Sequence, residues 1–195
     1  QSGEFKRALD LIENDSIQQN KQTQMFHKAY CLYRLNRCDE ALSALNSLSN
    51  VTENQILINH LRGQIEYKMG RYGNAVQTYE KLEKLQKEQP DDEDHDEDEF
   101  LTNITASYTL NRDYEKALAT SKKASTYELA YNAACASISL KKYDQAMEQL
   151  KDATKKCKKA LADDDYTEEQ INDELAAIVV QTAYVKQMTG DVESA

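Results

Sequence analysis

One short pattern of polar and apolar positions recurs six times along the 195-residue chain. It opens with a turn-forming or polar residue, has a usually aromatic residue two positions later, and ends, after two polar residues, with an alanine. The alanines are Ala8, Ala41, Ala75, Ala117, Ala146 and Ala195. They lie 33, 34, 42, 29 and 49 residues apart, a range of periods typical of stacked helical hairpins. The pattern predicts an all-α chain of paired helices, here called helix A and helix B, with each alanine in a helix B.

Two further sets of positions indicate hairpins of the tetratricopeptide kind. Where two helices cross closely, one of them needs a small side chain. Twelve positions before the alanines the chain has Ala29, Gly63, Thr105, Ala134 and Ala183. Four positions after their alanines stand the bulky Leu45, Tyr79 and Leu150, whereas Ser121 departs from this rule. Both features belong to the tetratricopeptide repeat (TPR) pattern of about 34 residues, so the chain resembles a right-handed superhelical solenoid of TPR hairpins.

We expect a single TPR array over residues 1–195 in which two long spacings mark insertions. One insertion is an acidic loop at 89–99, and the other spans 152–170, before a last helix A at about 174–188. The first helix B has no helix A before it, and the apolar face of the last helix A would lack a covering helix. That face holds Ile178, Val179, Tyr184 and Val185. We therefore expect an array truncated at both ends, with units at about 1–20, 22–50, 54–88, 99–124, 127–160 and 174–195.

Composition narrows the class of partner. The net charge of −10 and the pI of about 4.9 disfavour nucleic acid and anionic lipid as first partners. No run approaches the roughly 18 apolar residues of a membrane span, and the first residues have no signal-peptide layout. The four cysteines form no Cys-x-x-Cys pair, so we expect reduced and mostly buried thiols. These features predict a cytoplasmic protein.

Motifs for catalysis and for metal binding are missing from the sequence, so we expect no enzyme, no cofactor and no small-molecule substrate. The acidic run has neither the glycine nor the bidentate glutamate of a calcium loop, and His95 within it has no ligand set. His27 and His60 also lack further ligands at metal-binding spacing. A basic cluster comprises Lys151, Lys155, Lys156, Lys158 and Lys159. A solvated face of a helix B is the preferred interpretation of this cluster, and contact with RNA or an acidic surface is the alternative.

The partner-binding surface is predicted from the same repeat. Helix A lines the concave side of a TPR array, and its positions fifteen, eleven and eight before the alanine point into the groove. These offsets make the groove aromatic in the early repeats, and aromatic and amide side chains suit peptide binding. The predicted contact residues are Phe26, Tyr30, Tyr33, His60, Gln64 and Tyr67, extended by Asn103, Tyr131 and Asn132. The alternative is that individual tyrosines pack between helices.

Three segments are more specific than the repeat pattern. Residues 28–37 (KAYCLYRLNR), 131–136 (YNAACA) and 181–190 (QTAYVKQMTG) are similar to matching helices of the seventy-two-kilodalton subunits of the eukaryotic signal recognition particle. The resemblance runs in order across nearly the whole chain, apart from the first family repeat, and implies the amino-terminal TPR domain of such a subunit. In that family the domain binds the sixty-eight-kilodalton subunit, for assembly of the particle and cotranslational targeting to the endoplasmic reticulum.

The resemblance also implies where RNA is not bound. In the family, contact with the particle's RNA is attributed to a basic segment outside the part that this chain resembles, so RNA would be reached only indirectly. The competing function is a co-chaperone adaptor that grips an acidic peptide tail with lysine and asparagine side chains. At the positions of that clamp this chain has Phe26, Tyr30, His60 and Gln64. These residues disfavour the adaptor.

Overall fold

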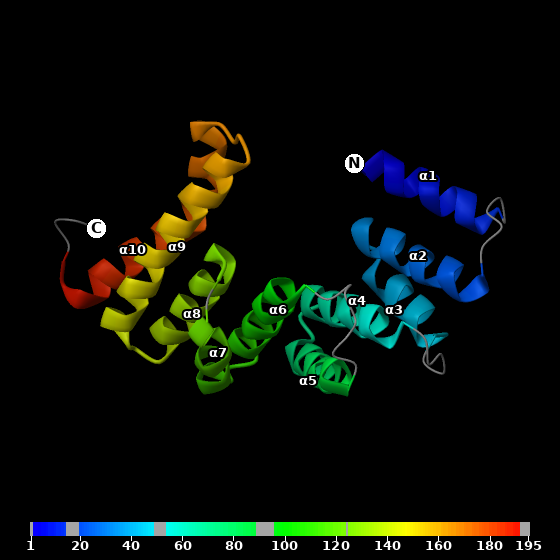
Figure 1. Ribbon diagram of the computed structural model, residues 1–195, viewed down its shortest axis with the longest axis horizontal. Coiled ribbons are helices and arrows are strands. Elements are labelled where there is room, and N and C mark those ends of the chain that lie inside the picture. Colours follow the sequence, from blue (N-terminus) through cyan, green and yellow to red (C-terminus); the bar gives the residue numbers. More distant parts are fainter. Residues whose placement is uncertain (1, 15–19, 49–53, 89–95, 124, 192–195) are drawn as a thin grey trace. The chain divides into compact units, whose positions relative to one another are not determined.

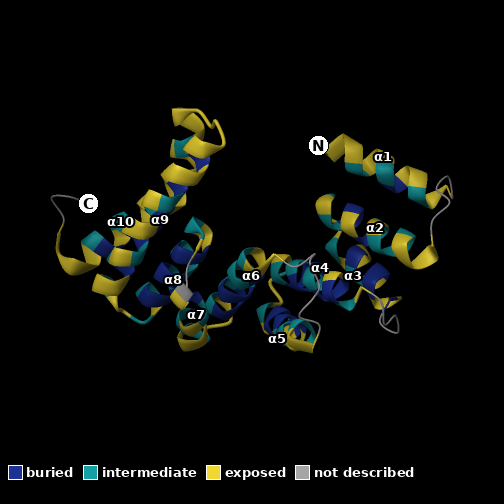
Figure 2. Cartoon of the chain, in the orientation of Figure 1, coloured by how far each residue is buried: buried dark blue, intermediate teal, exposed yellow. Residues whose placement is uncertain are grey.

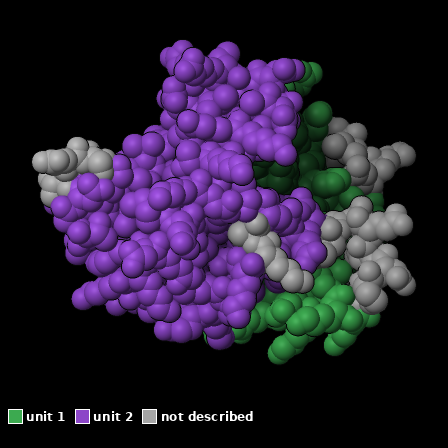
Figure 3. Space-filling model, turned by 60° about the vertical axis from the view of Figure 1, so that its left-hand side comes forward, with its two compact units in different colours: residues 1–94 green, residues 95–195 purple. Residues whose placement is uncertain are grey.

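The computed structural model describes residues 2–14, 20–48, 54–88, 96–123 and 125–191. Within these ranges the chain forms ten α-helices and one short 3₁₀ helix, with no strand (Figure 1). The chain divides into two compact units, residues 1–94 and 95–195, which Figure 3 shows in green and purple. The all-helical class predicted from the sequence is confirmed. The single array stays a prediction, and each unit is described by itself.

Unit 1 packs its helices in chain order. Each helix contacts the next along the sequence, and α2 also contacts α4. The first helix stands where the sequence predicts a helix B, and the others form two hairpins, α2 with α3 and α4 with α5. The helices are α1 (Ser2–Glu13), α2 (Lys21–Arg34), α3 (Cys38–Asn46), α4 (Gln55–Lys68) and α5 (Tyr72–Glu88).

Unit 2 repeats this arrangement with unequal helices. Hairpins form from α6 with α7 and from α8 with α9, and α10 packs on both α8 and α9. Helix α7 is short, and a 3₁₀ turn continues it into the next hairpin. The elements are α6 (Glu97–Leu110), α7 (Tyr114–Thr120), η1 (Ser121–Lys123), α8 (Tyr127–Ser139), α9 (Tyr143–Asp163) and α10 (Glu168–Thr189).

Gly3 of the first pattern lies inside α1, and in the other five patterns the opening residue ends a helix A in the left-handed backbone region. These residues are Asn36, Gly70, Arg112, Lys141 and Gly190, all with φ between 58° and 82°. The next residue donates its backbone N–H to a carbonyl five residues earlier, as from Arg71 to Glu66 at 2.9 Å and from Lys142 to Ser137 at 2.9 Å. This is the Schellman closure, which satisfies carbonyls left open at a helix end. The same local signal therefore stops helix A each time and turns the chain toward helix B.

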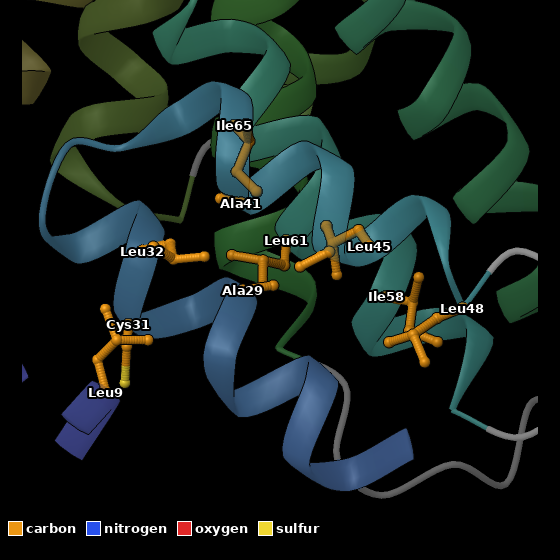
Figure 4. Close-up of a cluster of buried hydrophobic side chains, with 11 residues drawn as sticks. Leu9, Ala29, Cys31, Leu32, Ala41, Leu45, Leu48, Ile58, Leu61 and Ile65 are labelled. Carbon is orange, nitrogen blue, oxygen red and sulfur yellow. The ribbon is translucent and has the colours of Figure 1, made fainter. Parts of the chain in front are cut away.

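The small and bulky positions identified in the sequence form the interior. Ala29, Thr105 and Ala134 are fully buried, and so are Leu45, Tyr79 and Leu150 on the facing helices. Figure 2 shows the buried residues along the packed sides of the helices. In unit 1 one apolar cluster draws on all of the first four helices, including Leu9, Leu32, Leu45 and Ile65 (Figure 4). Ala183 is only half-buried, and within the described residues no helix B follows α10 to cross it.

Two expectations about element ends and one about a covering helix are wrong. Glu97 to Glu99 are not loop but the first turn of α6, where carboxylates are favoured by the helix dipole. Residues 89–95 of the acidic run, including His95, lie outside the described residues. Helix α10 begins at Glu168 rather than near 174, because Thr167 and Gln170 form a capping box. Ile178 and Val185 do not lack cover, since both are buried in the cluster that α8 and α9 form with α10.

The structure also shows the state of the cysteines and the hydropathy of the helices. All four thiols are free, with Cys31 and Cys157 buried and Cys38 and Cys135 half-buried, so burial is less complete than expected. Burial raises the pKa of the Cys31 and Cys157 thiols, which keeps them in the neutral form at physiological pH. Among the helices that the structure describes, none combines the length and apolar character needed to cross a membrane.

The contact between Gly63 and Tyr79 sets up a stability test. A Cβ at Gly63 would lie 2.5 Å from Cζ of the buried Tyr79 ring, so Gly63→Ala requires that the ring or one of the two helices shift. Overpacking costs about 1–3 kcal/mol, and the better helix propensity of alanine returns about 1 kcal/mol. We predict a net loss of up to about 2 kcal/mol in the free energy of unfolding, measured by urea titration.

Gly3→Ala is the matched control for this substitution, because no heavy atom lies within 4 Å of the Cβ at that helical position. It is expected to leave stability unchanged or raise it slightly. The double variant Gly63→Ala with Tyr79→Leu should recover part of the loss. Equal stabilities of the two glycine variants would contradict the proposed crossing.

Candidate functional site

The predicted contact residues of unit 1 lie along the helix A faces of α2 and α4. Phe26, Tyr33, His60, Gln64 and Tyr67 are half-buried, and Tyr30 is 37% exposed. The two helices are tied together at their carboxyl ends. Lys68 of α4 places Nζ 4.8 Å from the Tyr33 ring centroid and 3.4 Å from the Tyr33 carbonyl oxygen. These residues therefore lie on two contacting helices of one unit, and their contact with a partner stays a prediction.

Tyr30 has a structural role that the sequence offset does not reveal. Its ring meets the Phe5 ring of α1 edge to face, with centroids 6.0 Å apart. Arg34 donates a hydrogen bond to the Tyr30 hydroxyl at 2.7 Å and lies 4.5 Å above the Phe5 ring. Aromatic pairs of this kind contribute about 0.5–1.5 kcal/mol beyond their buried area. Tyr30 thus holds α1 on α2, and only its exposed edge remains for a partner.

Other aromatic rings of unit 1 also contact neighbouring rings. His60 meets Tyr79 at 6.2 Å between centroids, and Tyr67 meets Tyr72 at 5.5 Å. Both contacts join helix A to helix B within one hairpin. Phe26 instead lines a hollow of about 180 Å³ near the first turns of α2 and α4, together with Leu48 and the exposed Leu57. The alternative that the aromatics pack between helices is realised for Tyr30, His60 and Tyr67, so Phe26 is the clearest apolar contact candidate in this unit.

The three predicted residues of unit 2 are also half-buried. Asn132 donates from Nδ2 to the Thr102 carbonyl oxygen at 3.2 Å, a bond that joins α8 to α6. Tyr131 hydrogen-bonds the Cys135 side chain; burial raises the pKa of that thiol, and this bond partly opposes the effect. Asn103 lies on α6. Asn132 therefore acts first in packing, while Tyr131 and Asn103 stay predicted contact residues.

A larger apolar hollow in unit 2 was not predicted. It measures about 810 Å³ and lies among α6, α8 and α10, at the ends where α7 and α9 begin. Four apolar side chains on its lining are exposed, namely Leu110 (46%), Val180 (64%), Tyr184 (42%) and Met188 (48%). Arg112 and Lys141 add two cationic side chains. This concentration of exposed apolar groups is the strongest candidate for a protein-binding surface in the unit.

A sequence signal for that hollow was present. The offsets of fifteen and eleven residues before Ala195 select Val180 and Tyr184, just as the same offsets before Ala41 select Phe26 and Tyr30. The prediction omits these residues because the apolar side of the last helix has the pattern of a face that needs a covering helix. Val179 of the same helix is also exposed (60%) but does not line the hollow.

Metal binding and the lysine cluster can be examined directly. Within the described ranges no group of three His, Cys, Asp or Glu side chains is placed to hold a metal ion. The lysines lie along α9, where Lys151, Lys155, Lys158 and Lys159 are exposed. Lys156 instead pairs with Asp152, with Nζ 2.5 Å from Oδ2. The cluster therefore has the solvated position expected of it, and RNA contact is not tested by this geometry.

Comparison with known proteins identifies the chain's relatives. A tetratricopeptide repeat family model matches residues 57–89 and 127–155. The signal recognition particle subunit SRP72 of Canis lupus familiaris is 36% identical over 198 aligned positions, covering 100% of this chain. The human and Dictyostelium discoideum SRP72 proteins are 35% and 34% identical, covering 100% and 99% of it. The chain is a homologue of SRP72. It spans 28% of the length of each of these three relatives.

Solved structures add the fold of this SRP72 homologue. The chain superposes on MamA 41-end from Desulfovibrio magneticus RS-1 with a TM-score of 0.68, covering 91% of this chain and 90% of that one. A MamA D159K mutant superposes with a TM-score of 0.61. Sequence identities of 14% and 15% limit this likeness to the fold. Together with the family model, these matches show that this SRP72 homologue is built from TPR hairpins.

The packing of Tyr30 on Phe5 gives a prediction about α1. In Tyr30→Ala the edge-to-face contact and the Arg34 hydrogen bond are both lost. We expect amide hydrogens of α1 to exchange about tenfold faster, which corresponds to roughly 1.4 kcal/mol, measured by hydrogen–deuterium exchange mass spectrometry. Amides of α4 and α5 should not change. Tyr30→Phe, which keeps the ring, is the control, and unchanged α1 protection in Tyr30→Ala would contradict this role.

Proposed function

We propose that this SRP72 homologue is a protein-binding scaffold of the signal recognition particle that holds the sixty-eight-kilodalton subunit, SRP68. It would act in the cytoplasm, in particle assembly and cotranslational targeting to the endoplasmic reticulum. Homology to SRP72 over the whole chain supports the particle, and the TPR hairpins support a protein partner. The observation that carries the proposal furthest is the hollow of unit 2, with four exposed apolar side chains on its lining.

The energetics favour a partner that buries these side chains. Full burial of a Val, Leu or Met side chain contributes about 1.5–3 kcal/mol, and these side chains are roughly half exposed. A partner that covers all four would therefore recover several kcal/mol before the costs of association, which is enough for an anchor of a specific interface. A volume of about 810 Å³ accommodates several partner side chains, so the hollow suits an apolar stretch of a protein.

In unit 1 the proposed contact residues are those of the α2 and α4 face. Phe26 with the exposed Leu57 offers apolar area, and Gln64 offers an amide. Tyr33, Tyr67 and the edges of Tyr30 and His60 would contact the partner at the margins of their packing within the unit. RNA is not proposed as a direct ligand, because the chain carries a net charge of −10.

Two neighbouring valines on α10 allow a matched test. Val180→Asp places a carboxylate on the lining of the unit 2 hollow, whereas Val179→Asp places the same group on the adjacent side of the helix. Burying an unpaired charge costs several kcal/mol. We predict that Val180→Asp weakens binding of purified SRP68 by at least about tenfold, and that Val179→Asp changes it less than about twofold, by isothermal titration calorimetry.

Circular dichroism melting curves establish that both variants fold, as expected for residues that are 64% and 60% exposed. Phe26→Ala in the same assay tests the unit 1 face. Parent-like affinity of Val180→Asp would exclude the hollow as the contact. If the parent chain shows no binding to SRP68, the proposed partner itself is wrong.

A further inference from the structure

Helix α4 breaks the TPR pattern on one side. In that pattern large apolar residues stand four positions before, one before and three after the small residue of helix A. Around Thr105, α6 follows this rule with Leu101, Ile104 and Tyr108. Around Gly63, the same three positions of α4 hold Asn59, Arg62 and Glu66. Three adjacent polar side chains therefore occupy places that the fold normally fills with apolar ones.

These residues line a hollow of about 430 Å³ bounded by α3, α4 and α5. Its lining is rich in carboxamides, which come from all three helices: Asn46, Gln55, Asn59, Asn74 and Gln77. Three charged side chains complete it, Arg62, Glu66 and Lys81. All belong to unit 1, and none is among the proposed SRP68 contacts. The hollow is therefore a separate feature, and the inference drawn from it goes beyond the proposed function.

The polar groups on the floor of the hollow are buried. Asn59 is 3% exposed and donates to the Gln55 carbonyl oxygen at 2.6 Å. Glu66 is 7% exposed, and its Oε2 accepts a hydrogen bond of 2.7 Å from the Thr78 hydroxyl. In unit 2 the equivalent tie between helix A and helix B is neutral, with Ser137 donating to Gln149 Oε1 at 2.7 Å. Linking the two helices of a hairpin thus requires no carboxylate, and the hairpin geometry does not explain Glu66.

Neither cation of the hollow, Arg62 or Lys81, is paired with a carboxylate of the described residues. Arg62 donates from Nη1 to Asn46 Oδ1 at 2.7 Å, a neutral acceptor. Lys81 forms no ion pair with any described residue, and it stands one turn beyond Thr78 on α5. Because α4 and α5 are antiparallel and Thr78 faces Glu66, Lys81 lies level with Arg62, one turn before Glu66. A carboxylate accepts a hydrogen bond from Arg or Lys about twice as strongly as a neutral oxygen does.

We propose that this hollow binds an extended segment of a protein partner that carries an aspartate or glutamate. The carboxylate lies between Arg62 and Lys81 and displaces the Asn46 oxygen from Arg62. The carboxamides hold the main chain, because each offers one acceptor and two donors that match the C=O and N–H groups of a peptide unit. The floor from Gln55 to Glu66 is about 16 Å long at the rise of an α-helix, enough for roughly five extended residues. Glu66 takes a main-chain N–H at one end.

The test uses the full chain and a defined probe. The probe is a short Gly/Ser peptide with one central aspartate, acetylated and amidated so that the side chain carries its only charge. Its binding is followed by ¹⁵N NMR on the side-chain amide signals. We expect shifts of the carboxamide signals of Asn46, Asn59, Asn74 and Gln77, and an affinity at least about tenfold lower for Arg62→Gln, as expected for losing a charge-assisted hydrogen bond.

Matched controls remove the same charges elsewhere in unit 1. Lys81→Gln should lower the affinity for the probe severalfold. Lys84→Gln, on the same helix, and Arg71→Gln, in the turn between α4 and α5, should leave the affinity unchanged. A probe with asparagine in place of the aspartate should bind the parent chain as weakly as the aspartate probe binds the Arg62→Gln variant. Equal probe affinity of the Lys81→Gln and Lys84→Gln variants would overturn the proposal, as would a shift of the Gln64 carboxamide signal in place of those lining the hollow. Absence of shifts at millimolar probe, or displacement by an equal concentration of acetate, would exclude a peptide site as well.

Discussion

The close crossing of helix A and helix B within a hairpin is the contact on which the other features depend. Gly63 lets the Tyr79 ring lie where a side chain would otherwise stand, and alanine or threonine provides the same clearance in neighbouring hairpins. With the backbones this near, helix B covers one side of helix A, and the other sides of helix A meet the neighbouring hairpin and the solvent. Side chains for binding are thereby presented on helix A at fixed intervals.

Much of this architecture was predictable, because its determinants are local. A left-handed residue and a Schellman closure end each helix A, and both depend on a few consecutive residues such as Asn36-Arg37 or Gly70-Arg71. The predicted start of α10 is wrong because it follows from the spacing of the repeats and not from the local capping residues. Its capping box at Thr167 and Gln170 lies inside a segment whose unusual spacing suggested an insertion, and the long α9 uses most of that segment as helix. Repeat periodicity alone does not define such ends.

For the candidate site, the sequence predicts the direction of a side chain on helix A but not which side chain of another helix it meets. An offset along helix A predicts which way a side chain points, and in unit 1 the predicted residues lie on α2 and α4. What meets the side chain there depends on a second helix: Phe5 on α1 meets Tyr30, and Tyr79 on α5 meets His60. Conversely, Val180 and Tyr184 are exposed because α10 buries Ile178 and Val185 against α9 and leaves its other sides open. Contacts between helices distant in sequence therefore separate packing aromatics from accessible ones.

Helix α4 shows how one repeat can be altered without losing the fold. Its apolar contacts through Ile58, Leu61 and Ile65 keep it in the core of unit 1, and Gly63 keeps its crossing with α5. Asn59, Arg62 and Glu66 contribute no large apolar side chain to the core. Each instead forms a hydrogen bond with a residue of α3, α4 or α5. A network of this kind is satisfied only if all its members stay in place, so it restricts the hairpin more than an apolar surface would. Because local rules are broken most often where a protein binds or reacts, this side of α4 is set apart from the packing positions of the other repeats.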